Sequence, residues 1–189
     1  MKRIVLFASG SGSNVENIEQ YFRDNPEVSI SCVLSNKKDA KVFERCNRLN
    51  LNAIYFNRHS FYGSDCVLNI LKSLNPDLIV LAGFLWKIPD NLITNYPNKI
   101  INIHPALLPK YGGKGMYGMY VHEAVKNNNE TETGITIHYV NENYDEGAII
   151  KQAKVALSPN DTPEMIAEKV HHLEYEHFPK VIEQVLMGT

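Results

Sequence analysis

The twelve residues from Arg3 to Asn14, RIVLFASGSGSN, decide the fold of this chain. Their first half is almost continuously apolar, which is typical of a strand buried on both faces of a parallel sheet. A glycine-rich turn follows, and residues 15–22 then have the pattern of a helix. Strand, tight turn and helix N-terminus together leave free N–H groups at the positive end of the helix dipole. The stretch therefore predicts an α/β fold with an anion site after its first strand.

The same turn argues against a dinucleotide cofactor. Its two glycines let the backbone approach a phosphate closely, and Ser13 and Asn14 can cap the helix or donate to a ligand. The dinucleotide fingerprint requires a third glycine where this chain has Val15, and an acidic residue at the end of the second strand, where this chain has Asn36. We therefore expect a phosphate cradle and no NAD. A tight turn without a ligand is the alternative.

Hydrophobic periodicity continues the alternation of strands and helices along the chain. We expect strands at residues 28–34, 53–56, 78–82, 99–103, 133–140 and 147–155, and helices at 40–49, 61–74, 92–96, 119–126 and 163–186. Residues 133–140 alternate apolar and polar side chains, as a half-exposed strand does, and form a hairpin with the next strand. Thr162 is expected to cap the last helix. The pattern predicts one domain, residues 1–189, with a Rossmann-like, doubly wound, mostly parallel sheet, an antiparallel C-terminal hairpin and a long C-terminal helix.

Composition limits the classes of partner. The formal net charge is −2, which argues against a bulk electrostatic grip on nucleic acid or an anionic membrane. Three cysteines without a close pair fit a reducing cytosol, and we expect each to be a small buried side chain. The N-terminal apolar run is too short for a signal peptide or a membrane span. We therefore expect a cytoplasmic protein with small-molecule partners, which is a monomer or a homodimer.

The segment INIHPALLP, residues 101–109, places two polar side chains at the end of an apolar strand. Alternate residues of a strand face the same way, so Asn102 and His104 project together, and Pro105 ends the strand. An amide beside an imidazole suits an oxyanion donor next to a proton donor. The alternative is a buried histidine that a neighbouring carbonyl satisfies.

Other segments are less decisive. The loop at residues 83–89 contains the one tryptophan, Trp86, and predicts either core packing or an aromatic ligand wall. The long irregular stretch at residues 105–118 is typical of a functional or mobile loop. Asp145 lies in an acidic hairpin turn, where aspartate is most often a turn former. His171, His172 and His177 lack the spacing of metal ligands, so we predict no metal site.

Four segments of the chain resemble the phosphoribosylglycinamide formyltransferases. They are residues 9–14, residues 81–84, the run from Asn102 to Tyr111, and Asp145-Glu146-Gly147. The resemblance covers essentially the whole chain in order. It implies transfer of a formyl group from 10-formyltetrahydrofolate to the amine of glycinamide ribonucleotide, in de novo purine synthesis.

The resemblance also implies roles for individual residues. Asn102, His104 and Asp145 match the catalytic triad of the family, and Gly12, Ser13 and Asn14 match its substrate phosphate site. Leu85, Trp86, Lys87 and Ile88 would line the folate pocket together with Asn102, and Glu174 would contact the ribonucleotide. The phosphate-binding half would be about residues 1–100 and the folate and catalytic half about residues 101–189. A family arginine that binds folate has no clear counterpart near Gly63 or Ser64.

Two other function classes remain open. A sibling formyltransferase could use the same triad on methionyl-tRNA or a nucleotide sugar, but a tRNA substrate would favour a basic face or an added domain. A non-enzymatic nucleotide-binding module could also use the glycine-rich turn, because fold alone does not fix function.

Overall fold

The computed structural model describes residues 1–188 and confirms the predicted fold class. One sheet of seven strands runs in the order β3-β2-β1-β4-β5-β6-β7. Its strands are β1 (Lys2–Phe7), β2 (Val28–Ser35), β3 (Ala53–Tyr55), β4 (Leu78–Leu81), β5 (Ile100–His104), β6 (Glu132–Tyr139) and β7 (Ile149–Ala156). The strands from β3 to β5 pair in parallel, and β6 and β7 add antiparallel pairs.

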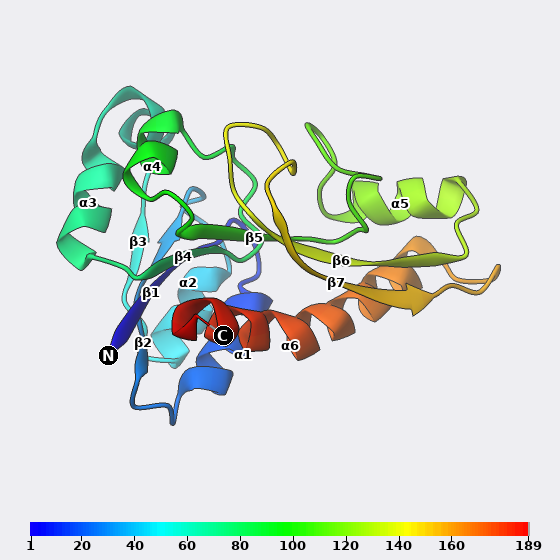
Figure 1. The fold of residues 1–189 in the computed structure, drawn as a ribbon, viewed down its shortest axis with the longest axis horizontal. Coiled ribbons are helices and arrows are strands. Elements are labelled where there is room, and N and C mark those ends of the chain that lie inside the picture. The colour runs from blue at the N-terminus through cyan, green and yellow to red at the C-terminus, as the bar shows by residue number, and fades with distance from the viewer. Residues whose placement is uncertain (189) are drawn as a thin grey trace.

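Helices cover both faces of this sheet (Figure 1). They are α1 (Ser13–Phe22), α2 (Val42–Arg48), the π-helical η1 (His59–Gly63), α3 (Cys66–Leu74), α4 (Asp90–Asn95), α5 (Met119–Asn127) and α6 (Pro163–Met187). One core joins α1, α2 and α6 to the sheet, and a second core joins η1, α3 and α4 to the other face. Thr162 caps α6 as expected, because its hydroxyl accepts from the N–H of Met165.

The expected helix at residues 61–74 is wrong in one respect, because the structure breaks it at Ser64. Ser64 is extended, with φ −156° and ψ 168°, and it separates η1 from α3. Phe61 is fully buried against Phe56, with ring centroids 5.0 Å apart, and also packs on Phe7. This aromatic packing holds the segment before Ser64 in its own turn, which periodicity along the chain does not reveal.

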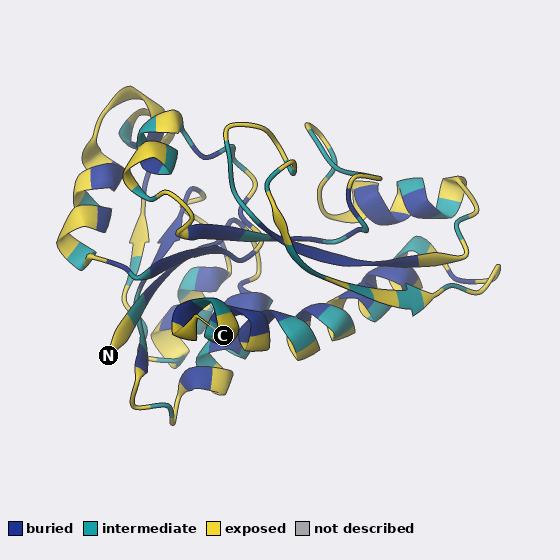
Figure 2. Cartoon of the chain, in the orientation of Figure 1, coloured by how far each residue is buried: buried dark blue, intermediate teal, exposed yellow. Residues whose placement is uncertain are grey.

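The prediction that β6 is half-exposed is also wrong. Six consecutive residues of β6, from Thr133 to His138, are buried (Figure 2). The chain after β5 folds back over the polar residues of this strand. The hydroxyl of Thr136 donates to the carbonyl of Ala106 and accepts from the N–H of Leu108. The hydroxyl of Thr136 is therefore satisfied by protein groups rather than by water.

Of the three cysteines, Cys32 and Cys46 are buried as expected, whereas Cys66 is exposed. Cys66 is the first residue of α3 and follows the break at Ser64. The break turns this position towards solvent, so the expectation for Cys66 is wrong.

Candidate active site

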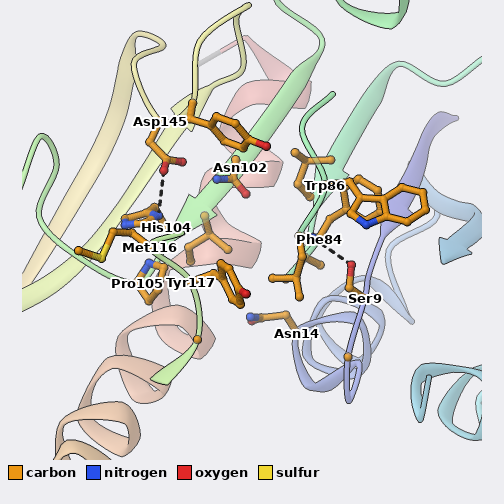
Figure 3. Close-up of a pocket in the computed structure, with 18 of the residues that line it drawn as sticks. Ser9, Asn14, Phe84, Trp86, Asn102, His104, Pro105, Met116, Tyr117 and Asp145 are labelled. Carbon is orange, nitrogen blue, oxygen red and sulfur yellow. Dashed lines mark hydrogen bonds and ion pairs between the residues drawn. The ribbon is translucent and has the colours of Figure 1, made fainter. Parts of the chain in front are cut away.

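A cavity of about 620 Å³ lies at the carboxyl ends of β1, β4 and β5, where the loops of a parallel sheet converge. Its walls come from segments far apart in the chain, which Figure 3 shows in part: the glycine-rich turn, the loop after β4, the end of β5, residues 113–118, and the turn that carries Asp145. Every residue that the sequence analysis singled out as a site residue lines this cavity: Gly12, Ser13, Asn14, Leu85, Trp86, Lys87, Ile88, Asn102, His104, Asp145 and Glu174.

His104 is held between two acceptors. It is 3% exposed, and its Nε2 donates to the carbonyl of Tyr111 over 2.7 Å. Its Nδ1 lies 3.6 Å from Oδ2 of Asp145, the pair that Figure 3 joins with a dashed line. Burial lowers the pKa of His104 below its usual value, while the charge of Asp145 and the bond to Tyr111 act in the opposite direction. The protonated ring has an acceptor for each N–H.

Asp145 is oriented by the backbone as well as by the two histidines beside it. Its own φ is +56°, a left-handed conformation that aspartate tolerates better than most residues. Its Oδ2 accepts from the N–H of Gly113 over 2.9 Å, and its Oδ1 lies 3.6 Å from Nε2 of His138. Burial raises the pKa of Asp145, but His138, the charge of His104 and the Gly113 N–H together bring it below the usual value. The carboxylate therefore stays ionised beside His104.

The analysis of the sequence missed His138. It lies on β6 directly opposite Asn102 on β5. Its Nδ1 donates to the carbonyl of Tyr139 over 2.8 Å, which leaves Nε2 to accept from Nδ2 of Asn102 at 3.2 Å. His138 therefore fixes which way the Asn102 amide points. The position of His138 in the alternating strand was visible in the sequence, but the register that sets it opposite Asn102 was not.

The glycine-rich turn leads into α1 in a conformation suited to an anion. Gly12 is the residue before the helix and is left-handed, with φ +75°. No side chain caps α1, so the first N–H groups of the helix are not occupied by a cap. Asn14 does not cap either, because its Nδ2 donates to Oε2 of Glu174 over 2.9 Å. The N-terminus of α1 therefore presents free donors at the cavity wall.

The part of the cavity wall formed by α1, α5 and α6 contains buried polar groups with unfilled hydrogen-bonding capacity. Glu174 on α6 is 6% exposed, and burial raises its pKa although the bond from Asn14 acts against this. His122 on α5 is 3% exposed. Burial, with smaller effects of His171 and His104, lowers the pKa of His122 to about 4. Within residues 1–188, neither Oδ1 of Asn14 nor Nδ1 of His122 has a hydrogen-bond partner. Polar groups of a ligand would fit such a wall.

Trp86 belongs both to the core and to the cavity wall, so the two readings of its loop are compatible. It packs on Phe56, Phe61 and Phe84 with ring centroids 5.9 to 6.5 Å apart, and it also lines the cavity. The guanidinium of Arg58 lies 5.7 Å from the centre of the Trp86 ring and 5.0 Å from that of Tyr62. The resemblance implies a folate-binding arginine near the third strand, for which the sequence offers no clear counterpart at Gly63 or Ser64. The structure brings Arg58, which follows β3, next to the Trp86 loop.

Within residues 1–188, no group of three or more His, Cys, Asp or Glu side chains is arranged to hold a metal ion. None of the helices in that range is long and apolar enough to cross a membrane.

Comparison with known proteins gives consistent matches over nearly the whole chain. A family model described as formyl transferase matches residues 2–182. The chain is 36% identical over 191 residues to the phosphoribosylglycinamide formyltransferase of Bacillus subtilis, covering 98% of this chain and 95% of that protein. It is 37% identical to the chloroplastic phosphoribosylglycinamide formyltransferase of Arabidopsis thaliana, covering 96% of this chain but only 64% of that longer protein.

Solved structures agree. A crystal structure of phosphoribosylglycinamide formyltransferase from Anaplasma phagocytophilum superposes with a TM-score of 0.90 at 31% identity, covering 98% of this chain and 87% of that one. The glycinamide ribonucleotide transformylase 1 of Geobacillus kaustophilus superposes with a TM-score of 0.88 at 34% identity, covering 98% and 99%. These matches agree with the resemblance drawn from the motifs.

Proposed function

Because this chain belongs to the formyl transferase family, we propose that it transfers the formyl group of 10-formyltetrahydrofolate to the amine of N1-(5-phospho-D-ribosyl)glycinamide. The products are the N-formyl ribonucleotide and tetrahydrofolate, in de novo synthesis of purines (IMP). The observation that carries the proposal is the convergence of Asn102, His104 and Asp145 on one cavity beside the glycine-rich turn. An amide, an imidazole and a carboxylate in one cavity suit acyl transfer through a tetrahedral intermediate.

The ribonucleotide is anchored at its phosphate. Gly12, Ser13 and Asn14 present the N-terminus of α1 to this anion, and Glu174 contacts the rest of the ribonucleotide. Anchoring fixes the amine against the formyl carbon and turns the encounter of two molecules into a local step. In ideal cases such positioning lowers a barrier by about 7–11 kcal/mol.

The neutral amine attacks the formyl carbon, so that a new C–N bond forms and the formyl oxygen gains negative charge. Asn102 donates to this oxyanion from an amide that His138 holds in place. The imidazolium of His104 stabilises the same charge and gives its proton to the departing folate nitrogen when the bond from that nitrogen to the formyl carbon breaks. The attacking nitrogen, positively charged once its own bond to carbon has formed, loses one proton to the imidazole, which restores the imidazolium. Asp145 favours the imidazolium because an opposite charge nearby raises the pKa of a histidine.

The formyl donor occupies the part of the cavity next to Leu85–Ile88, with Trp86 as its aromatic wall. We assign to Arg58 the role of the folate-binding arginine, because it stacks on Trp86 and carries a positive charge suited to the carboxylates of a folate. The loop 85–88 belongs to the first half of the chain and Asn102 to the second. The two halves, about 1–100 and 101–189, thus both contribute to the folate site. We expect the enzyme to work in the cytoplasm, as a monomer or a homodimer.

The test is a spectrophotometric assay of tetrahydrofolate release from 10-formyltetrahydrofolate, with and without the ribonucleotide. Release that depends on the ribonucleotide supports the proposal. A protein that gains thermal stability from both ligands but transfers no formyl group would instead be a binding module.

A further inference from the structure

Ser9 connects three loops at the floor of the cavity. It lies two residues after the end of β1 and is 2% exposed. Its hydroxyl accepts from the N–H of Leu85 over 3.0 Å and donates to Oδ1 of Asn36 over 2.7 Å. Its own N–H donates to the carbonyl of Gly83 over 3.1 Å. Figure 3 shows Ser9 and a dashed line from its hydroxyl towards the loop that carries Phe84 and Trp86.

These bonds join the two substrate loops through one side chain. The turn proposed to hold phosphate begins at Gly10, next to Ser9, and the loop proposed to hold the folate begins at Leu85. Because β2, β1 and β4 are neighbours in the sheet, the loops that follow them meet at one edge, and Ser9 lies at the central strand. The hydroxyl acts as donor and acceptor at once, which an apolar side chain of similar size cannot do.

We propose that Ser9 is a positioning residue that fixes the phosphate anchor at the right distance from the formyl donor. This inference rests on the function proposed above. Binding energy from a remote group such as a phosphate raises turnover only if a rigid connection transmits it to the reacting atoms. A displacement of about 1 Å between reacting groups can cost on the order of 100-fold in rate. Ser9 supplies that rigid connection.

The variant Ser9→Ala is suited to the test because it removes the hydroxyl but keeps the backbone hydrogen bonds around residue 9. The backbone bond from residue 9 to Gly83 and the pairing of β1 with its neighbours do not involve the hydroxyl. The variant loses the bonds to Leu85 and Asn36, and the carbonyl oxygen of the 6%-exposed Asn36 side chain loses its partner. We therefore expect a folded protein in which the glycine-rich turn and the loop that begins at Leu85 are no longer held at a fixed distance from each other.

The experiment compares two substrates, the glycinamide ribonucleotide and the same molecule without its phosphate. With the phosphorylated substrate, Ser9→Ala should lower kcat by about tenfold or more and leave both KM values within about threefold. With the dephosphorylated substrate, the substitution should change kcat/KM by less than about twofold. This substrate has no phosphate, so Ser9 has no phosphate binding energy to transmit to the reacting atoms. Ser35→Ala, which removes another buried hydroxyl at this sheet edge, should show no such dependence on the phosphate.

A structural readout accompanies the kinetics. Exchange of the Leu85 amide hydrogen should become faster in Ser9→Ala than in the original protein, while amides in the middle of β1 and β4 keep their protection. An equal loss of kcat with both substrates, or unchanged kcat with a lowered melting temperature, would show that Ser9 only supports the fold. Absence of formyl transfer by the unsubstituted protein would instead overturn the proposed function.

Discussion

Asp145 faces His104 from a turn between two antiparallel strands, with Oδ2 3.6 Å from Nδ1, although His104 ends a strand of the parallel part of the sheet. The relationship depends on the left-handed φ of Asp145 and on the Gly113 N–H that holds Oδ2. Gly112 also leaves space for this carboxylate, because a Cβ there would lie 3.3 Å from the Cβ of Asp145. The position of the Asp145 carboxylate in the ion pair of the proposed mechanism is therefore set by the backbone at Asp145 itself and by the backbone at Gly112 and Gly113.

This pair predicts a pH effect of Asp145→Asn. The carboxylate raises the pKa of His104, and burial lowers it. Without the carboxylate, the pKa of His104 falls further, so the imidazolium is lost at a lower pH. The descending limb of kcat with rising pH should move to lower pH in Asp145→Asn. The measurement is the pH–rate profile of both proteins, and a limb that stays in place would contradict the role given to Asp145.

Asn102→Ala should lower kcat by about 10² to 10³-fold, the usual effect of removing one oxyanion donor. His138→Phe should also lower kcat, because Asn102 loses the acceptor that orients its amide. The double variant should cost little more than Asn102→Ala alone, since both act through one amide. Steady-state kinetics of the three variants check this, and fully additive effects would show that His138 acts independently of Asn102.

Gly12→Ala should weaken binding of the ribonucleotide and not of the folate. A Cβ at this position would lie 2.5 Å from Cγ2 of Val42, and the φ of +75° is unfavourable for any residue with a Cβ. The turn must shift, and the phosphate donors shift with it. KM for the ribonucleotide should rise at least about tenfold, which corresponds to about 1.4 kcal/mol. Gly10→Ala, where a Cβ meets nothing within 4 Å, is the matched control.

Trp86→Ala and Arg58→Gln should raise KM for 10-formyltetrahydrofolate. Trp86 is the proposed aromatic wall of the folate site, and the guanidinium of Arg58 lies over its ring. KM for the ribonucleotide should change by less than about twofold, because neither side chain belongs to the glycine-rich turn proposed to hold its phosphate. Titration of each substrate at saturation with the other separates the two effects, and a uniform rise in both KM values would argue for a structural role.

His122 makes the fold sensitive to acid. Its pKa in the folded protein is about 4, below the value of 6.5 of an exposed histidine, so the unfolded chain binds the proton first as pH falls. The folded state loses stability between pH 6.5 and about 4, by up to about 3 kcal/mol for a difference of this size. His122→Leu should remove this part of the pH dependence in urea unfolding. The same substitution at the exposed His172 should leave the slope unchanged.

The fold was largely predictable because local pattern and tertiary environment agree over most of the chain. The apolar run of β1 is buried on both faces, and the turn at Gly12 needs the left-handed conformation that glycine provides. The helix break at Ser64 was not predictable, because the segment before it packs through Phe61 on Phe7 of β1 and on Phe56, which follows β3, and these contacts are not visible in the sequence. The burial of β6 was missed for a similar reason, since Ala106 and Leu108 satisfy Thr136.

The site residues also divide into those that the sequence predicts and those that only the fold reveals. Asn102 and His104 share a face through the two-residue period of a strand, which the sequence displays. Their meeting with Asp145 depends on the turn after β6, and their contact with His138 depends on strand register. Arg58 could not be assigned from the sequence because the fold alone brings the segment after β3 against Trp86 in the loop after β4. Periodicity along the sequence does not reveal residues such as these, because their contacts depend on how strands and turns meet in the folded chain.

The most direct test of the account is the turnover of His104→Ala with both substrates bound. Isothermal titration first establishes that the variant binds the ribonucleotide and a folate analogue with affinities within about threefold of the original protein, and tetrahydrofolate release is then measured at saturation. The account predicts a loss of turnover of about 10² to 10⁴-fold, the contribution typical of a positioned proton donor. Turnover within a few-fold of the original protein would contradict it.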